Sequence, residues 1–266
     1  ENTSLNDLVN AVENTPFETW TPLAESYYEL CSYYRQTAPI FYPNDYHIGG
    51  HWDPMYDKNF GDVTTVWCRK SFVLLITDGE STMDRDNVLS TIGDYDNDGS
   101  DPGSYPSYGS DYLDDVALWS HVNDLRSDIP GFQNLTLYTV FAFGHGSQLL
   151  QDAAKNGGFE DRNGNNIPDL PREWDRDQDG EIDTYFEAEE GYALERAIME
   201  AIADILRRVG SASAVSIVSS TAKGEGTIYQ AFFQPKRQVQ DVELSWLGQL
   251  VSYWIDQYGN IREDTD

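Results

Sequence analysis

Basic residues are scarce in this sequence, where 17 Lys and Arg stand against 46 Asp and Glu and give a formal net charge of −29. A surface of that sign repels nucleic acid phosphates and anionic lipid headgroups, so we expect no nucleic acid partner. Long apolar runs are absent as well. No stretch approaches the ~20 apolar residues of a membrane-spanning helix, so we expect no membrane insertion. No basic, apolar leader stands at Glu1, so a signal peptide is either absent or already removed.

Cysteine is also rare, with Cys31 and Cys68 the whole complement. An even pair in a chain rich in Tyr, Asn and Gly favours a secreted protein with one disulfide. Such a bridge would contribute about 3–4 kcal/mol to stability on a chain-entropy estimate. Two buried free thiols are the alternative. An apolar content of 39% is sufficient for a hydrophobic core, which argues against global disorder.

The stretch that organises the rest of the chain is Lys70–Glu80, with the sequence KSFVLLITDGE. Five successive apolar residues, Phe72–Ile76, predict a strand buried on both faces, as in a parallel sheet covered by helices. Such a strand delivers Asp78 to the carboxyl edge of the sheet, where ligands of open α/β sheets bind. The alternative is that Asp78 only opens an Asp-Gly turn.

Periodicity predicts the remaining elements. Buried strands are expected near 135–143 and 184–188, and helices near 5–12, 23–31, 111–125, 148–155 and 192–209. Beyond Gly210 the pattern changes to successive strands near 214–218, 227–233 and 244–255. We therefore expect a layered α/β domain over residues 1–210, with helices on both faces of the sheet, followed by a β region over residues 211–266.

An acidic loop before the strand near 184–188 predicts a Ca²⁺ site. Alternate carboxylates of a tight loop point inward, a glycine permits the sharp turn, and a backbone carbonyl adds an oxygen, as in an EF-hand. The residues in those roles are Asp175, Asp177, Asp179, Gly180, the carbonyl of Glu181, and Asp183. The twelfth position is Phe186, which cannot bind a cation, so Glu187 is the nearest candidate for the missing carboxylate. An unoccupied, solvated acidic turn is the alternative.

Two further loops repeat this pattern and give two or three expected Ca²⁺ sites in all. One comprises Asp161, Asn163, Asn165, the carbonyl of Ile167, and Asp169. It carries fewer charges, and Asn166 replaces the glycine, so it should bind more weakly. The other comprises Asp94, Asp96 and Asp98, with Gly99 at the turn. We expect the acidic loops to surround the sheet edge that carries Asp78.

Other polar groups give weaker signals. His47, His51 and Asp53 could hold Zn²⁺, but in a loop of Gly and Pro they fit ordinary surface residues better. Ser147 follows His145 in a Gly-rich turn, yet no G-x-S-x-G elbow is present and no acid partner can be assigned. The sequence therefore gives no support for a catalytic centre, and we expect no enzyme.

Several segments together resemble one family. Thr21–Ala24, and Cys68 leading into Phe72–Gly79, are similar to the second half of a von Willebrand factor A domain. Tyr112–Ala117, Leu149–Ala154 and Ala212–Val215 resemble the PilY/PilC-type proteins at the tip of bacterial type IV pili. The segments occur in family order from about Leu5 to Ile255. Gln230–Phe233 and Trp246–Leu250 would, by this resemblance, lead toward a β-propeller that the sequence lacks.

The resemblance implies a metal-ion-dependent adhesion site at the carboxyl edge of the sheet. In that family the site uses a D-x-S-x-S motif, a Thr from a later loop and an Asp after the fourth strand. Thr21 matches the Thr and Asp78 matches the Asp, but the D-x-S-x-S motif is absent. Mg²⁺ at so incomplete a site would be bound weakly.

The resemblance also implies that the sheet keeps three of about six strands. An open edge beside Phe72–Ile76 is unfavourable in a soluble monomer, so we expect a separate chain or a cleaved segment to complete the sheet. The alternative is that the sequence is a fragment. The implied function is that of an extracellular, calcium-binding module of a pilus-tip adhesin or assembly protein. Its implied partners are pilin or minor pilins and a host or surface ligand. The alternatives are a secreted metal-dependent hydrolase and a structural cell-surface protein stiffened by Ca²⁺.

Overall fold

A computed structural model describes residues 5–14, 20–41, 47, 52–53, 57, 69–99, 105, 107–209, 216–220, 226–239, 242–255 and 261–262, with side chains only up to residue 209. The chain divides into two compact units, Glu1–Ala201 and Ile202–Asp266. The division falls inside the helix α6 (Gly191–Val209), whereas the sequence predicts a boundary just after this helix, near Gly210.

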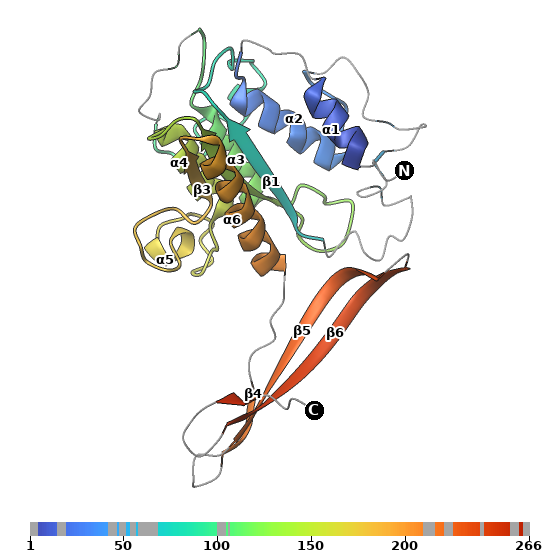
Figure 1. The fold of residues 1–266 in the computed structure, drawn as a ribbon. Helices are drawn as coiled ribbons and strands as arrows, with labels where there is room; N and C mark the ends of the chain where they lie inside the picture. Colours follow the sequence, from blue (N-terminus) through green and yellow to red (C-terminus); the bar gives the residue numbers. More distant parts are fainter. Residues whose placement is uncertain are drawn as a thin grey trace. The chain divides into compact units, whose positions relative to one another are not determined.

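The first unit is built on a parallel sheet with the strand order β1-β2-β3. Its strands are β1 (Ser71–Thr77), β2 (Leu135–Ala142) and β3 (Tyr185–Ala188). Helices cover both faces of this sheet (Figure 1), which confirms the predicted layered α/β architecture. None of the helices in the described part of the chain is long and apolar enough to cross a bilayer.

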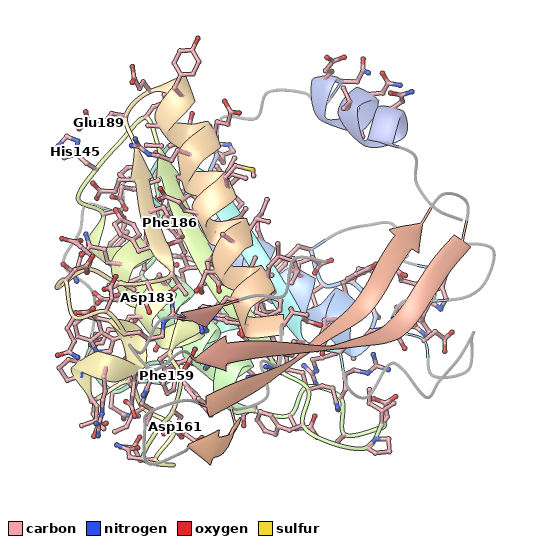
Figure 2. All side chains as sticks on the ribbon, turned by 60° about the horizontal axis from the view of Figure 1, so that its bottom comes forward. His145, Phe159, Asp161, Asp183, Phe186 and Glu189 are labelled. Atoms are coloured by element: carbon pink, nitrogen blue, oxygen red, sulfur yellow. The ribbon has the colours of Figure 1, made fainter. Side chains whose placement is uncertain are left out.

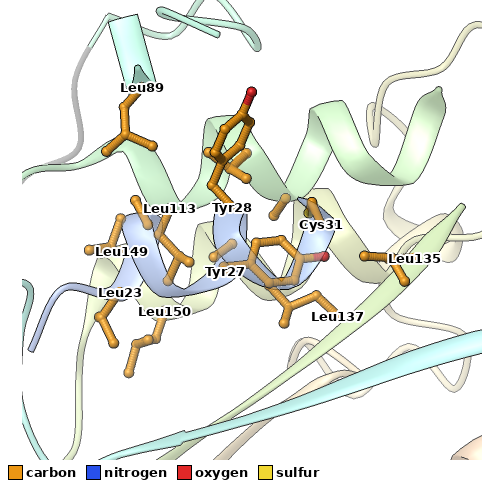
Figure 3. Packing of buried hydrophobic residues seen from close by; sticks show 14 of the residues in the cluster. Leu23, Tyr27, Tyr28, Cys31, Leu89, Leu113, Leu135, Leu137, Leu149 and Leu150 are labelled. Carbon is orange, nitrogen blue, oxygen red and sulfur yellow. The ribbon is translucent and has the colours of Figure 1, made fainter. Parts of the chain in front are cut away.

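The main core lies on the face of the sheet covered by three helices, α2 (Leu23–Arg35), α3 (Tyr112–Val122) and α4 (Gln148–Gly158). Their buried side chains interlock with the odd-numbered residues of β2, including Leu135 and Leu137 (Figure 3). Close packing of α4 on the sheet depends on Gly157, because a Cβ there would lie 2.7 Å from the Cβ of Leu137. A longer side chain at this position would force the helix away from β2.

The opposite face of the sheet is covered by the first half of α6. Ala197 packs there against Val140 and Ala188, with Leu74 and Phe186 partly buried beside them. The small side chains of α6 bring the helix close to the sheet but cover little of it. Several large apolar residues of α6 accordingly stay exposed, with Tyr192 at 84% the most accessible.

β1 departs from its expected environment. The apolar run of Phe72–Ile76 predicts a strand buried on both faces, but β1 is only half-buried and its Ile76 is 45% exposed. β2 is the buried strand, with every residue except Thr136 buried, because it lies between β1 and β3. β1 has β2 on one side and no described strand on the other, which agrees with the open edge expected beside it.

The remaining helices of the first unit are short. α1 (Leu5–Glu13) forms at the predicted place, whereas the 3-10 helix η2 (Leu89–Thr91) and α5 (Pro171–Trp174) were not anticipated. α3 begins within its predicted range, with Asp111 at the N-cap position, and the hydroxyl of the preceding Ser110 donates to Asp84.

The second unit is an antiparallel sheet with the order β4-β5-β6-β7. Its strands are β4 (Ser216–Ser220), β5 (Gly226–Val239), β6 (Val242–Ile255) and β7 (Ile261–Arg262). β5 and β6 form a long hairpin in which Gly226 pairs with Ile255 and Val239 with Val242. The three predicted strands are thus present, and β5 and β6 extend beyond the predicted ranges.

Candidate metal centres

The three acidic loops share one backbone conformation. In each loop the fourth and the sixth residue have a positive φ: Asn97 and Gly99 (65° and 98°), Gly164 and Asn166 (78° and 62°), and Gln178 and Gly180 (63° and 95°). Gly and Asn adopt this conformation with little strain, which explains their presence at the turn. The sequence repeat is therefore a repeat of structure as well.

The first aspartate of each loop accepts a hydrogen bond from the backbone N–H five residues later. The distances are 3.3 Å from Gly99 N to Asp94 Oδ1, 3.0 Å from Asn166 N to Asp161 Oδ2, and 2.9 Å from Gly180 N to Asp175 Oδ2. This bond closes each loop on its leading carboxylate. Wrapping of this kind gathers the oxygen ligands that Ca²⁺ prefers.

The loop of Asp94, Asp96 and Asp98, hereafter loop I, lies against α3 and α4. Carboxylate oxygens of Asp94, Asp96 and Asp115 lie within 4.8 Å of one another, and so do those of Asp96, Asp98 and Asp114. Asp114 and Asp115 of α3 were not predicted as ligands, although two consecutive carboxylates in a first helical turn are visible in the sequence.

Loop I is fixed to both helices by hydrogen bonds. The carboxylate of Asp115 accepts from the backbone N–H of Tyr95, and Asn156 of α4 donates from Nδ2 to Asp96 Oδ2 at 2.8 Å. Tyr95 also holds the far end of α3, since Asn123 Nδ2 donates to its hydroxyl at 2.7 Å. A cation in this loop would therefore connect the loop directly to α3.

Crowding of carboxylates perturbs the acidity of loop I. Burial raises the pKa of Asp115 to about 7, with further upward contributions from Asp96 and Asp94 and a downward one from the Tyr95 N–H. Burial also raises the pKa of Asp98, and Asp96, Asp152 and Asp94 raise it further. The ionised cluster is thus electrostatically unfavourable without a counter-ion, and a divalent cation would relieve that repulsion.

The loop of Asp175–Asp183, hereafter loop III, forms a second carboxylate cluster. Oxygens of Asp175, Asp177 and Asp183 lie within 4.8 Å of one another. Asp179, a predicted ligand, is not in this cluster, and its carboxylate accepts from the N–H of Glu181 at 2.8 Å. The carbonyl of Glu181 stays a predicted ligand. Asp183 also binds Arg176 Nε at 2.7 Å, so one basic residue already neutralises part of the cluster.

Glu187 does not complete loop III. Its Oε1 accepts from Gly146 N at 2.7 Å and from the Tyr185 hydroxyl at 2.6 Å, toward the other end of β3. The suggestion that Glu187 supplies the twelfth-position carboxylate is therefore wrong in this structure. Phe186 occupies that position and packs into the core beneath α6, which leaves three clustered carboxylates in loop III.

The loop of Asp161–Asp169, hereafter loop II, brings three of its predicted polar side chains together. Asn163 and Asn165 donate from Nδ2 to the two oxygens of Asp169, at 2.8 and 3.0 Å. Desolvation raises the pKa of Asp161, but backbone N–H groups of Asn166, Gly164, Asn165 and Asn163 outweigh it and leave the pKa lowered. The Ile167 carbonyl accepts from Asp169 N at 2.9 Å.

A buried carboxylate that the sequence analysis missed holds the base of loop II. Glu173, 1% exposed, accepts from Arg162 N at 2.9 Å and from Leu170 N at 3.1 Å. These bonds join the two ends of loop II. Glu173 therefore stabilises loop II because its carboxylate accepts hydrogen bonds from the loop backbone.

The acidic loops do not all surround Asp78, contrary to the expectation from the sequence. Figure 2 shows Asp161 and Asp183 at one end of β3 and His145 and Glu189 at the other. Loop III directly precedes β3, so the chain direction places it at the amino edge of the parallel sheet, whereas Asp78 follows β1 at the carboxyl edge. Loops II and III thus lie at the end of β3 opposite to the sheet edge that carries Asp78.

The structure brings Thr21 and the Asp78-Gly79 turn together, as the adhesion-site resemblance implies. Thr21 Oγ1 lies 3.8 Å from the position that a Cβ would take on Gly79. Two hydrogen bonds fix this approach: Thr21 N donates to Thr82 Oγ1 at 2.6 Å, and Thr82 N donates to the Thr21 carbonyl at 2.9 Å. Asp78 is exposed at this edge.

The segment after Asp78 is anchored by Asp84, another residue that the sequence analysis missed. Asp84 is fully buried and accepts from four groups: Ala24 N, Glu25 N, and the hydroxyls of Ser81 and Ser110. Burial raises its pKa, and these hydrogen bonds offset part of the increase. Nothing in the sequence around Asp84 indicates that it caps α2, a helix far away along the chain.

The other candidate groups have structural partners. Ser147 caps α4, where its hydroxyl accepts from Leu150 N and donates to Glu80 Oε2 at 3.2 Å. His145 instead faces Glu189, with Nδ1 at 3.7 Å from the carboxylate. Asp53 accepts a hydrogen bond from the Tyr33 hydroxyl, His47 stacks near Trp52, and His51 lies outside the described residues.

Cys31 carries a free thiol, fully buried between α2 and α3. Burial raises the pKa of this thiol to about 12, while Ser120 and Arg35 act in the opposite direction. Cys68 lies outside the described residues, so its pairing with Cys31 stays a prediction that the free thiol does not support.

Comparison of the chain with protein-family models, with curated proteins and with solved structures gave no match.

Proposed function

We propose that this chain is an extracellular, calcium-binding module of a von Willebrand factor A-like type, which acts in surface attachment and pilus biogenesis at a type IV pilus tip. The proposal of calcium binding rests on the backbone conformation that loops I, II and III share. In each loop a backbone N–H donates a hydrogen bond to the first aspartate and closes the loop. Oxygen donors arranged in this way suit Ca²⁺ better than softer metals. The net charge of −29 adds to this support, since bound cations would neutralise part of it.

The adhesion part is supported by the meeting of Thr21 with the Asp78-Gly79 turn at the carboxyl edge. The hydroxyl of Thr21 and the carboxylate of Asp78 would provide oxygen ligands for Mg²⁺ at an incomplete site. No catalytic step is proposed. The candidate partners are pilin or minor pilins and a surface ligand, and the proposed location is the bacterial cell surface.

A purely structural role of the ions is the second candidate. It is favoured by the position of loops II and III, which lie at the end of β3 opposite to the sheet edge that carries Asp78. On that account Ca²⁺ stiffens these loops and contacts no partner. Surface plasmon resonance with purified pilin, in Ca²⁺ and in EDTA, separates the two: adhesion predicts calcium-dependent binding, whereas a structural role predicts none.

Calorimetric melting tests the calcium proposal. We expect the melting temperature to rise in millimolar Ca²⁺ relative to EDTA, since a ligand at 100 times its Kd adds about 2.7 kcal/mol. Asp175→Asn should reduce the increase, and so should Asp96→Asn. Glu195→Gln on the exposed surface of α6 removes the same charge outside the loops and should leave the increase unchanged. An identical melting temperature in Ca²⁺ and EDTA would refute the proposal.

A further inference from the structure

His121, in the last turn of α3, has a hydrogen-bond acceptor beside each of its two ring nitrogens. Nδ1 lies 2.9 Å from the carbonyl oxygen of Leu135, the first residue of β2. Nε2 lies 2.9 Å from the carbonyl oxygen of Phe159, the residue that follows α4. The ring therefore joins the end of one helix to the start of the central strand and to the end of a second helix.

The two carbonyl acceptors determine how many protons the ring carries. A carbonyl oxygen can only accept a hydrogen bond, so each ring nitrogen must donate one. A neutral imidazole has a single N–H, and the lone pair of its other nitrogen would face a carbonyl oxygen at 2.9 Å. Only the imidazolium, which carries a hydrogen on both nitrogens, satisfies the two contacts.

The surroundings of the ring also suit a positive charge. His121 is partly buried and packs against the ring of Phe159, with the ring centroids 4.9 Å apart. It lies at the carboxyl end of α3, where the backbone carbonyls of the last turn favour a cation. Asn134 holds the backbone of the same turn, because its Nδ2 donates to the His121 carbonyl. The residue is thus fixed through its backbone as well as through its ring.

Charged groups near these contacts are of both signs. β2 itself has no charged residue. The charged residues nearest in the sequence on the adjoining segments are Asp124 after α3, Lys155 in the last turn of α4, Glu160 after Phe159, and Arg69 and Lys70 before β1. Glu160 binds Arg176 Nη1 at 3.4 Å, and Asp124 accepts from the backbone N–H of Arg126 at 3.0 Å. Neither sign dominates, so the two carbonyl contacts decide the protonation of His121.

We propose that His121 is a proton-dependent clamp, which is protonated on both nitrogens at neutral pH and holds the ends of α3 and α4 to the start of β2. Loss of one proton at higher pH deprives one of the two carbonyls of its donor, so the clamp opens on that side. Phe159 stands two residues before Asp161, and opening there would loosen the segment that leads into loop II. This inference is independent of calcium binding.

The clamp gives the stability of the fold a defined pH dependence. A histidine in an unfolded chain releases its proton at about pH 6.5. The folded chain keeps the proton, because only the charged ring makes both hydrogen bonds. Above that pH the folded state therefore binds more protons than the unfolded state, and the free energy of unfolding falls as the pH rises. The contribution of the clamp is complete in mildly acidic solution and is lost in alkaline solution.

Nitrogen NMR of the His121 ring tests the proposal on the full chain in EDTA. The imidazolium gives two similar ring ¹⁵N shifts, whereas the neutral ring gives two widely separated ones. We expect the imidazolium pattern at pH 7 in the native chain, and mainly the neutral pattern for the same residue in urea. His121→Gln removes these signals and thereby assigns them. A neutral ring at pH 7 in the native chain would overturn the proposal.

Urea denaturation between pH 6.5 and 8.5 tests the effect on stability. Asp115→Asn is the reference chain here, because the raised pKa of Asp115, about 7, falls in the same range. We expect its free energy of unfolding to fall as the pH rises, and the added change His121→Gln to reduce this slope. Asn134→Ala, added instead, removes a hydrogen bond from the same turn but no titratable group, and should lower stability equally at every pH. Equal slopes with and without His121 would contradict the clamp.

Discussion

Asp84 Oδ2 accepts a hydrogen bond from the backbone N–H of Ala24 at 2.9 Å, although 60 positions separate the two residues. The same carboxylate binds Glu25 N at 2.8 Å. Asp84 thereby satisfies two orphan donors at the start of α2, a helix whose own N-cap, Pro22, has no side chain able to accept them. The contact joins the segment after β1 to the helix that carries the core on one face of the sheet.

Replacement of Asp84 should be strongly destabilising. Asp84→Ala leaves two buried N–H groups and two hydroxyls without an acceptor, so we expect a loss of about 2–4 kcal/mol in the free energy of unfolding. Urea denaturation in EDTA measures it. Asp86→Ala is the matched control, because Asp86 is exposed and caps only Val88 N. Equal losses for the two variants would contradict the anchoring role of Asp84.

The raised pKa of Asp115 predicts a pH-dependent stability of the ion-free protein. Its folded pKa of about 7 exceeds the ordinary value for aspartate, so between about pH 4 and 7 the folded state binds a proton that the unfolded state has released. Stability in EDTA should therefore fall as pH rises through this range and then level off. Asp115→Asn removes this contribution and should flatten the curve. An unchanged curve in the variant would assign the pH dependence to other groups.

Cys31 should be unreactive in the folded protein. Its thiol is fully buried, and its pKa of about 12 leaves almost no thiolate at pH 8. We expect no modification by a thiol reagent at pH 8 in the native state and complete modification in guanidinium without reductant. Mass spectrometry of the Cys31 peptide measures both. Protection that persists in guanidinium and disappears after reduction would instead establish a disulfide.

Replacement of Gly157 by alanine should create a steric clash in the core, an effect that helix propensity alone would not predict. Alanine in place of a helical glycine usually stabilises, but at Gly157 the new Cβ would lie 2.7 Å from that of Leu137 and 3.2 Å from that of Ala117. We expect Gly157→Ala to lower the free energy of unfolding by about 1–3 kcal/mol. At Gly191 a Cβ would meet nothing within 4 Å, so Gly191→Ala should be neutral or slightly stabilising. Similar effects at both positions would contradict the close approach of α4 to β2.

The sequence predicted the strands and helices of the first unit well, because each combines a clear apolar period with local end signals. The cap that Ser147 provides for α4 was not among the predicted features. The loops were recognisable because Gly99 and Gly180 occupy the same place in the repeat as Asn166. The edge position of β1 was expected only from the family resemblance, since an apolar run looks the same in an edge strand and a central one.

The parts that could not be predicted depend on distant contacts. Asp115 and Asp114 join loop I because the fold packs α3 beside it, and no local pattern encodes that approach. Glu187 was assigned to the wrong site because nearness in sequence was taken for nearness in space. Alternate residues of β3 point to opposite faces, so Phe186 packs partly buried under α6 while Glu187 turns toward Gly146.

Isothermal titration of the EDTA-treated chain with Ca²⁺ tests the central claim most directly. The account predicts two or three bound ions per chain, and the loss of one site in a variant that combines Asp94→Asn with Asp96→Asn. The same titration of Glu195→Gln should match the parent chain. Absence of saturable binding at millimolar Ca²⁺, or an identical stoichiometry in the loop I variant, would contradict it.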